Sequence, residues 1–296
     1  MPNRKDIRTR DPFIVAHNGI YYLYCATGSK DGNTIVAYRS CDLEEWDEPV
    51  DVYTLSTDTW KEAELWAPEV HLYRDKFYLF LSIKGKNGLR GTEISVADTP
   101  MGPFLPISDR AATPLDKSCI DGTLFVDGDV PYIVYSRDWP DHYVATRDAY
   151  VGQISAQQLS EDLTTPIGDA FLLFESTDCP YSAEHPAKHD WEGKDVTRFG
   201  SDAPFINRLS DGRLFLTWSP FAVDKYVVLG AVAKDIRGPW THLDTPLYDN
   251  NGGHAMFFTT FDGVRKMCIH QPERRPDERT LILDAVEQNG QIVVQA

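Results

Sequence analysis

Five short segments of the chain carry polar side chains that could act on a bound molecule. Each segment stands just before a run of apolar or aromatic residues, and in four of the five the polar residue is a carboxylate. The five residues are Asp11, Glu69, Asp121, Asp202 and His254. Carboxylates brought close together cannot all ionise freely, so at least one keeps its proton near neutral pH. A protonated carboxyl beside an ionised one can supply a general acid and a general base.

The elements that must position these side chains are β-hairpins. In each case the apolar run is followed by a turn and then by a second apolar run. The turns read Asn18-Gly19, Arg74-Asp75-Lys76, Asp127-Gly128, Asp211-Gly212 and Asp262-Gly263. Asn-Gly or Asp-Gly between hydrophobic runs is a strong hairpin signal, because both turn residues adopt a positive φ. The sequence therefore predicts five repeated hairpins.

The repeat spacing indicates the architecture. The five polar residues recur at intervals of about 50 residues, apart from a third interval of about 80, and such a period with β-hairpins is typical of a propeller. We predict an all-β, five-bladed β-propeller with a funnel-shaped central active site, forming one domain over residues 1–296. Its blades open near residues 11, 69, 121, 202 and 254. The long interval predicts an insertion at about 177–199.

Composition narrows the class of partner. The formal net charge is −16, which argues against nucleic acid and anionic membrane surfaces as partners. The five cysteines are odd in number and widely spaced, so we expect free thiols rather than disulfides. The N-terminus carries no apolar signal-peptide core, and no stretch reaches the roughly 18 apolar residues of a membrane span. We therefore expect a cytoplasmic protein, with a secreted protein lacking its leader as the alternative.

Taken together, the five segments resemble glycoside hydrolase family 43, whose members are five-bladed propeller enzymes. The resemblance covers nearly the whole chain, from about residue 11 to about residue 287. It is carried by Arg10-Asp11-Pro12-Phe13, Trp66-Ala67-Pro68-Glu69, Asp121-Gly122-Thr123-Leu124, Asp202-Ala203-Pro204-Phe205 and Gly253-His254-Ala255-Met256, with Gly238-Pro239-Trp240 in addition.

The resemblance implies a role for each of three carboxylates. Asp11 corresponds to the general base that activates water, Asp121 to the carboxylate that orients the acid and tunes its pKa, and Asp202 to the general acid. The family usually has a glutamate at the acid position, in a Glu-Gly-Pro context, whereas this chain reads Asp202-Ala203-Pro204. Glu184, in the insertion, is the alternative acid.

Further residues are predicted to bind substrate or metal. An aromatic ring beside the funnel can hold the apolar face of a sugar, and Trp66 has this position, although it could equally be a core residue. We expect Glu69 and Arg279 to bind substrate as well, with pairing to Arg10 or Arg39 as the alternative for Glu69. The resemblance implies that His254 lies near a central metal ion, often calcium, whose role would be structural or to polarise the acid cluster.

The resemblance thus implies an inverting exo-glycosidase that acts on small pentose-containing oligosaccharides. An α-L-arabinofuranosidase is the first choice and a β-xylosidase the second. Inversion requires base and acid carboxyls roughly 6.5–9.5 Å apart, to leave room for water. Two alternatives stay open: a degenerate propeller that binds sugars without cleaving them, and a related five-bladed fructan hydrolase, which would retain configuration.

Overall fold

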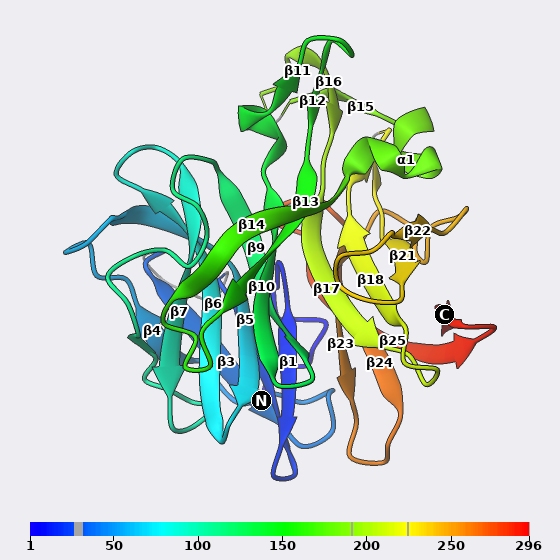
Figure 1. The fold of residues 1–296 in the computed structure, drawn as a ribbon. Helices are drawn as coiled ribbons and strands as arrows, with labels where there is room; N and C mark the ends of the chain where they lie inside the picture. Colours follow the sequence, from blue (N-terminus) through cyan, green and yellow to red (C-terminus); the bar gives the residue numbers. More distant parts are fainter. Residues whose placement is uncertain (27–31, 191, 224, 296) are drawn as a thin grey trace.

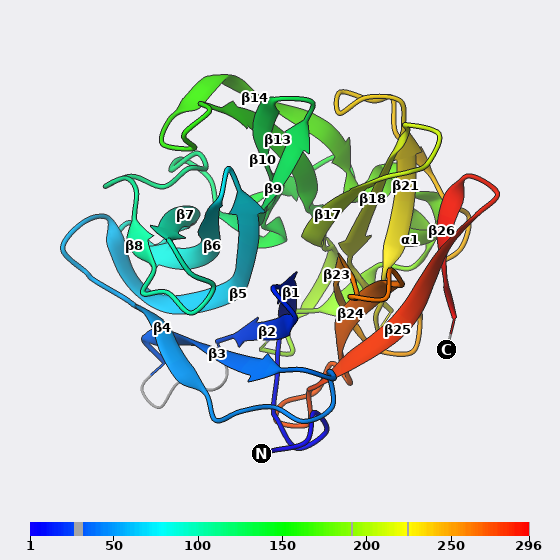
Figure 2. The same cartoon turned by 90° about the horizontal axis from the view of Figure 1, so that it is seen from below.

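The computed structural model describes residues 1–26, 32–190, 192–223 and 225–295, and it is built almost entirely of β-strands (Figure 1). Five four-stranded antiparallel sheets stand around a central axis, as the view from below shows (Figure 2). The predicted all-β five-bladed propeller is confirmed.

Each blade takes its four strands from one continuous or nearly continuous part of the chain. Blade 1 comprises β1 (Phe13–His17), β2 (Ile20–Cys25), β3 (Thr34–Ser40) and β4 (Val50–Thr54). Blade 2 comprises β5 (Lys61–Tyr73), β6 (Lys76–Gly85), β7 (Arg90–Ala97) and β8 (Leu105–Pro106). Blade 3 comprises β9 (Cys119–Asp127), β10 (Val130–Arg137), β13 (Gln153–Leu159) and β14 (Pro166–Glu175). Blade 4 comprises β17 (Asp202–Arg208), β18 (Leu214–Ser219), β21 (Leu229–Ala233) and β22 (Thr241–His242), with a small hairpin of β19 (Phe221–Ala222) and β20 (Lys225–Tyr226). Blade 5 comprises β23 (Gly253–Thr259), β24 (Arg265–Gln271), β25 (Arg279–Gln288) and β26 (Gln291–Gln295).

A sixth four-stranded sheet, here called the accessory sheet, is built from two insertions. The first lies between β10 and β13 and contains η1 (Trp139–Asp141), β11 (Tyr143–Val144) and β12 (Ala149–Val151). The second lies between β14 and β17 and contains η2 (Ser176–Asp178), α1 (Pro180–Glu184), β15 (Ala187–His189) and β16 (Asp195–Phe199). Parallel pairing of β12 with β16 joins the two. The accessory sheet stands out from the propeller at the top of Figure 1.

The insertion predicted at 177–199 is therefore half of a sheet rather than an irregular loop; residue 191 lies outside the described residues. Sequence reasoning did not find the other half, because strands of two or three residues carry too little periodicity to be recognised.

A left-handed residue lies just before or near the beginning of four of the innermost strands and in the middle of the fifth, β5. The five residues concerned have φ between 47° and 60°, and they are Asp11, Ala67, Asp121, Ala203 and His254. A register shift beside four of them, Ala67, Asp121, Ala203 and His254, shows that the strand is bulged there, and such a bulge redirects a side chain. The equivalent positions of the repeat are thus not the five residues that the sequence suggested. Asp202 lies one residue before its bulge position and Glu69 two residues after.

The bulges also connect neighbouring blades. Backbone N–H groups at four of these positions donate to a side chain of the preceding blade in the ring, because the left-handed conformation takes them out of the strand ladder. The bonds are Asp11 N–H to His270 Nδ1 at 3.3 Å, Asp121 N–H to Ser82 Oγ at 2.7 Å, Ala203 N–H to Asp121 Oδ2 at 3.0 Å and His254 N–H to Ser219 Oγ at 2.9 Å. The same distortion therefore aims the site residues and fixes them.

The apolar core is divided among the blade interfaces. Each of the five interfaces has a separate cluster of buried apolar side chains. Trp46 lies fully buried between blades 1 and 5, and Trp218 between blades 3 and 4. The ring is closed by the N-terminal segment, where Thr9 and Thr280 share a hydrogen bond of 2.6 Å between their hydroxyl groups. Because the clusters are distributed, the blades can hold a polar channel at the centre.

The burial of the cysteines agrees with the sequence in part. All five cysteines are free; Cys25, Cys119, Cys179 and Cys268 are buried as expected for structural thiols, whereas Cys41 is exposed. Within the described ranges, no helix is long and apolar enough to cross a membrane.

Replacing Gly122 by alanine should lower the free energy of unfolding by about 1–3 kcal/mol, the range for overpacking. Gly122 follows Asp121 on β9, and a Cβ atom there would lie 2.5 Å from Thr92 Oγ1 of blade 2 and 2.9 Å from Ile133 Cδ1. Gly200→Ala is the matched control, because its nearest neighbouring atom would be 3.7 Å away. Urea denaturation measures both variants, and equal losses of stability would contradict the packing argument.

Candidate active site

Two connected cavities lie where the innermost strands begin. The deep chamber, of about 270 Å³, is lined by Asp11, Asp121, Asp202, Tyr226 and His254 among others. The outer chamber, of about 950 Å³, extends from it toward the accessory sheet. The residues that line both are Arg10, Trp66, Ile120, Asp202 and Arg275. The structure thus brings the three predicted catalytic carboxylates together and places Asp202 where the chambers meet.

Asp11 is held as an ionised carboxylate. Its Oδ1 lies 3.1 Å from His254 Nδ1 and 3.3 Å from His270 Nδ1, and its Oδ2 lies 3.9 Å from Arg10 Nε. Burial alone would raise the pKa of Asp11, but His254, the hydrogen bond from His270 and the charge of Arg10 hold that pKa well below its usual range. An ionised, buried carboxylate can take a proton from water, as the role of base requires.

His270 and Glu273 are functional candidates that sequence reasoning missed. His270 is fully buried and contacts Asp11 through one ring nitrogen and Glu273 through the other. Burial lowers the pKa of His270, but the hydrogen bonds to the two carboxylates outweigh it and raise that pKa. Arg10 completes the network with a 2.8 Å ion pair to Glu273. A single histidine at the end of a strand gives no sequence signal for such a bridge.

Asp121 lines the deep chamber next to Asp202 but does not line the outer chamber. Its Oδ2 accepts the N–H of Ala203 at 3.0 Å, which fixes the residue next to Asp202. Burial, followed by the negative charges of Asp202 and Asp11, raises the pKa of Asp121 well above its usual range. Asp121 can therefore hold a proton at neutral pH and position the backbone that carries Asp202.

Asp202 has the environment of a general acid. Burial and the negative charge of Asp138 raise its pKa to about 7, although Arg198 acts in the opposite direction. The Tyr226 hydroxyl lies 3.4 Å from Asp202 Oδ2. Asp138 itself lines the outer chamber, and burial raises its pKa to about 7. The sequence identified Asp202 but gave no indication of Asp138 as its neighbour.

Trp66 lines both chambers, and 38% of its surface is exposed. The Arg90 guanidinium lies over the Trp66 ring, 3.1 Å from the centroid. Such a stack orients the indole and leaves part of it free for the apolar face of a sugar. Trp66 is thus at the chamber wall, as the prediction of a sugar platform requires, and not in the core.

Three predicted residues lie elsewhere. Glu69 is buried and its carboxylate lies 3.0 Å from His71 Nε2, so it pairs with neither Arg10 nor Arg39 and lines neither chamber. Arg279 donates to the backbone carbonyl groups of Lys5, Pro276 and Glu278. Glu184 is exposed at the end of α1. The neighbours of Arg279 in sequence, Arg274 and Arg275, line the outer chamber instead, and Arg275 lines the deep chamber as well.

The metal prediction finds little support in the donor set. Among the described residues, no three histidine, cysteine or acidic side chains gather in an arrangement that could hold a metal ion. His254 uses Nδ1 for Asp11, so only Nε2 is left to offer. Calcium takes six to eight oxygen ligands, and this surrounding does not supply them. The calcium ion stays a prediction that rests on the resemblance.

The arrangement defines a class of protein. Two carboxyl groups with pKa values driven apart, in a chamber with an aromatic wall, supply a base and an acid at neutral pH. A pair of carboxyl groups with these two roles is what hydrolysis of a glycosidic bond requires. Residues 5–291 match the family described as glycosyl hydrolases family 43. The chain belongs to family 43 of the glycoside hydrolases.

Relatives of this family are similar over most of the chain. A solved structure of an endo-arabinase from Bacteroides thetaiotaomicron is 34% identical, with a TM-score of 0.86 and 98% of both chains covered. A xylosidase/arabinosidase of Bacteroides ovatus is 33% identical over 68% of this chain and 64% of its own length. An extracellular exo-α-(1→5)-L-arabinofuranosidase of Streptomyces avermitilis is 21% identical over 90% of this chain and 55% of its own. The chain thus spans between half and two thirds of these two curated relatives.

Asp138→Asn should move the alkaline limb of the kcat/KM profile to lower pH. After burial, the charge of Asp138 contributes most to the raised pKa of Asp202. Without that charge the acid loses its proton at a lower pH, and the alkaline limb reports this loss in the free enzyme. The measurement is a pH series on an aryl pentoside. The exposed Asp211→Asn variant is the control, and an unmoved alkaline limb in Asp138→Asn would refute the coupling.

His270→Gln should move the acidic limb of the same profile to higher pH. Glutamine cannot bridge both carboxylates, so the pKa of Asp11 rises when a hydrogen bond that lowers it is lost. Protonation then removes the base at a higher pH than in the parent enzyme. A thermal melt checks that the variant is folded. A folded variant with an unchanged acidic limb would show that His270 does not position the base.

Proposed function

We propose that the protein is an inverting exo-glycosidase that releases single pentose units from small oligosaccharides. The observation that carries this proposal is the pair of chambers: Asp11 lies in the deep chamber, and Asp202 lies where it meets the outer one. The deep chamber lies just below the roughly 300–1,000 Å³ of drug-sized ligand sites, which suits one sugar ring. The outer chamber then receives the remainder of the oligosaccharide.

The residues act in one displacement. Ionised Asp11 takes a proton from a water molecule, whose oxygen bonds to the anomeric carbon from the face opposite the leaving group. The glycosidic carbon–oxygen bond breaks as Asp202 donates its proton to the leaving oxygen. The products are a free sugar of inverted configuration and a shortened oligosaccharide. Negative charge on Asp11 also stabilises the positive charge that develops on the ring.

The sugar is assigned by the relatives' names and not by a contact. We propose an α-L-arabinofuranoside as the first substrate, because the names of all three relatives include an arabinose-releasing or arabinan-cleaving activity. A β-xyloside is the second, because the Bacteroides ovatus relative carries both names. Partial exposure of the Trp66 ring supports a ligand with one apolar face.

A second mode of action has a specific observation in its favour. The structure with 34% identity and coverage of nearly the whole chain is named an endo-arabinase. An endo-acting enzyme would produce a mixture of oligosaccharides from linear arabinan, whereas the proposed exo-acting enzyme produces the monosaccharide from the outset. Chromatography of early products therefore decides between them.

The decisive experiment measures hydrolysis of aryl α-L-arabinofuranoside and aryl β-D-xyloside. Asp11→Ala should lose activity by at least about 100-fold on both phenolic and natural substrates, the lower range for a general base. Asp202→Asn should keep activity on the phenolic leaving group, which needs little protonation, and lose it on natural oligosaccharides. Glu184→Gln, a carboxyl of the exposed insertion, is the matched control and should behave as the parent enzyme.

Four results would overturn parts of the proposal. Wild-type activity in Asp11→Ala would remove its role as base. Loss of activity in Glu184→Gln would restore it as the acid. Retention of anomeric configuration, observed by NMR of the first product, would exclude the inverting mechanism and favour the fructan-type alternative. A protein that binds but does not cleave either sugar would be the degenerate propeller.

A further inference from the structure

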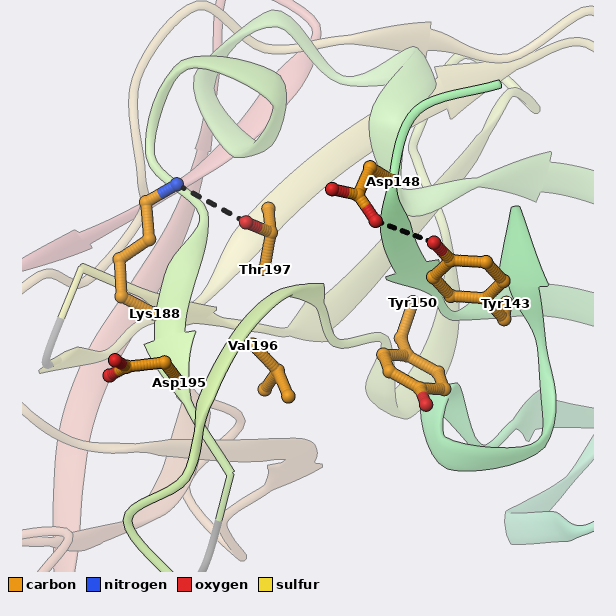
Figure 3. A pocket seen from close by; sticks show the side chains of 7 residues that line it. All are labelled: Tyr143, Asp148, Tyr150, Lys188, Asp195, Val196 and Thr197. Atoms are coloured by element: carbon orange, nitrogen blue, oxygen red, sulfur yellow. Dashed lines mark hydrogen bonds between the residues drawn. The ribbon is translucent and has the colours of Figure 1, made fainter. Parts of the chain in front are cut away.

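The accessory sheet contains a cavity of its own, of about 440 Å³ (Figure 3). It is separate from the deep and outer chambers, with which it shares no lining residue. The lining residues are Tyr143, Asp148, Tyr150, Lys188, Asp195, Val196 and Thr197. They come from both insertions, since Tyr143 to Tyr150 belong to the first and Lys188 to Thr197 to the second. The cavity, here called the Tyr143 cavity, exists only because β12 and β16 pair.

An aromatic series connects the Tyr143 cavity with the outer chamber. Trp139, which lines the outer chamber, packs edge-on against Tyr150 with 5.8 Å between ring centroids. Tyr150 in turn packs against Tyr143 at 5.2 Å. Tyr143 and Tyr150 are directly opposite in the β11–β12 ladder and therefore project from one face. A ligand that leaves the outer chamber past Trp139 reaches this face next.

The outer chamber is also continuous with the accessory sheet through Arg198. This residue lies on β16, one position after Thr197 of the cavity, and lines the outer chamber. Its guanidinium stands over the rings of Trp139 at 4.9 Å and Phe221 at 4.7 Å. The strand that forms one wall of the Tyr143 cavity thus ends in a wall of the outer chamber.

The chemistry of the lining suits a neutral, hydroxyl-rich chain. Tyr143 is 51% exposed, so its ring is available for stacking on the apolar face of a sugar. The Tyr143 hydroxyl donates to Asp148 at 2.5 Å, and Lys188 Nζ lies 3.5 Å from Thr197 Oγ1, so polar groups flank the rings. Two acidic side chains against one lysine, in a chain of net charge −16, disfavour a polyanion. The volume falls in the roughly 300–1,000 Å³ range of ligand sites.

We propose that the Tyr143 cavity binds the distal part of a long, neutral pentose-rich chain whose end occupies the catalytic chambers, which extends the proposed substrates from small oligosaccharides to polysaccharides. The sugars nearest the cleaved bond lie in the outer chamber, and those further along pass Trp139 to stack on Tyr150 and Tyr143. The cavity would raise affinity for long chains and leave short substrates unaffected. The identity of the chain as a pentose polymer rests on the proposed function; the site and its aromatic contacts do not.

The test measures binding separately from catalysis. Affinity gel electrophoresis in soluble linear arabinan and in arabinoxylan compares Asp202→Asn with the double variant Asp202→Asn/Tyr143→Ala, so that no polymer is cleaved. Loss of one stacked ring should raise the apparent Kd about 3- to 10-fold, the equivalent of an aromatic contact. Tyr143→Phe keeps the ring and should bind nearly as the parent does. With Asp202 intact, Tyr143→Ala should cleave aryl pentosides at the parental rate.

Phe261→Ala is the matched control, because Phe261 is 50% exposed and lies in the β23–β24 turn at the other end of the propeller. It should change neither binding nor activity. Polymer affinity unchanged in Tyr143→Ala would overturn the proposal, as would absence of polymer binding by the parent or an equal loss with aryl pentosides. Weaker polymer binding in Tyr143→Ala together with no hydrolysis by the wild type would uphold the cavity and refute the proposed catalytic function instead.

Discussion

Burial of three carboxyl groups beside one chamber is the constraint on which the rest of the site depends. Like charges in a poorly solvated space repel, so the carboxyls cannot all be ionised. In the structure, the three carboxyl groups have different charged neighbours, and their pKa values therefore shift in different directions. Asp11 lies among His254, His270 and Arg10, whereas Asp121 and Asp202 face other carboxyls. The pKa of one group is thereby lowered and the pKa values of the other two are raised, and this difference in surroundings separates the proposed base from the proposed acid.

The bulges explain how a β-sheet architecture can bring such groups together. A regular strand would alternate its side chains between the two blade faces and leave none directed along the axis. A left-handed residue on or just before each innermost strand breaks this alternation at five equivalent places. Two of the five places hold an aspartate, one holds a histidine and two hold an alanine. The five blades therefore share a backbone conformation at this position but carry side chains of different chemistry there. Asp202 reaches the chamber from the position before its bulge.

The accessory sheet adds side chains outside the propeller that could contact a bound ligand. The propeller alone supplies a chamber suited to one sugar ring, because its inner strands converge. The two insertions add aromatic and polar side chains beyond Trp139, at a distance from the axis that the blades do not reach. Their pairing across about 45 residues of intervening sequence makes one surface from two short segments. The insertion is thus a component of ligand recognition in our proposal, not a spacer between blades.

Local patterns in the sequence were sufficient for the repeat and for the three carboxylates. Turn residues with positive φ and apolar runs act within a few residues, so hairpins such as the one at Asn18-Gly19 can be predicted from neighbours alone. Asp11, Asp121 and Asp202 were found because they precede these runs. The partners that give them their roles were not: His270, Glu273 and Asp138 lie in other parts of the sequence and meet the site only when the ring closes. The structure places Arg279, Glu184 and Glu69 away from the chambers for the same reason. The direction of a side chain depends on bulges and blade contacts that no single segment encodes. Protonation, in particular, is a property of the assembled chamber, because desolvation and charge act through space and not along the chain.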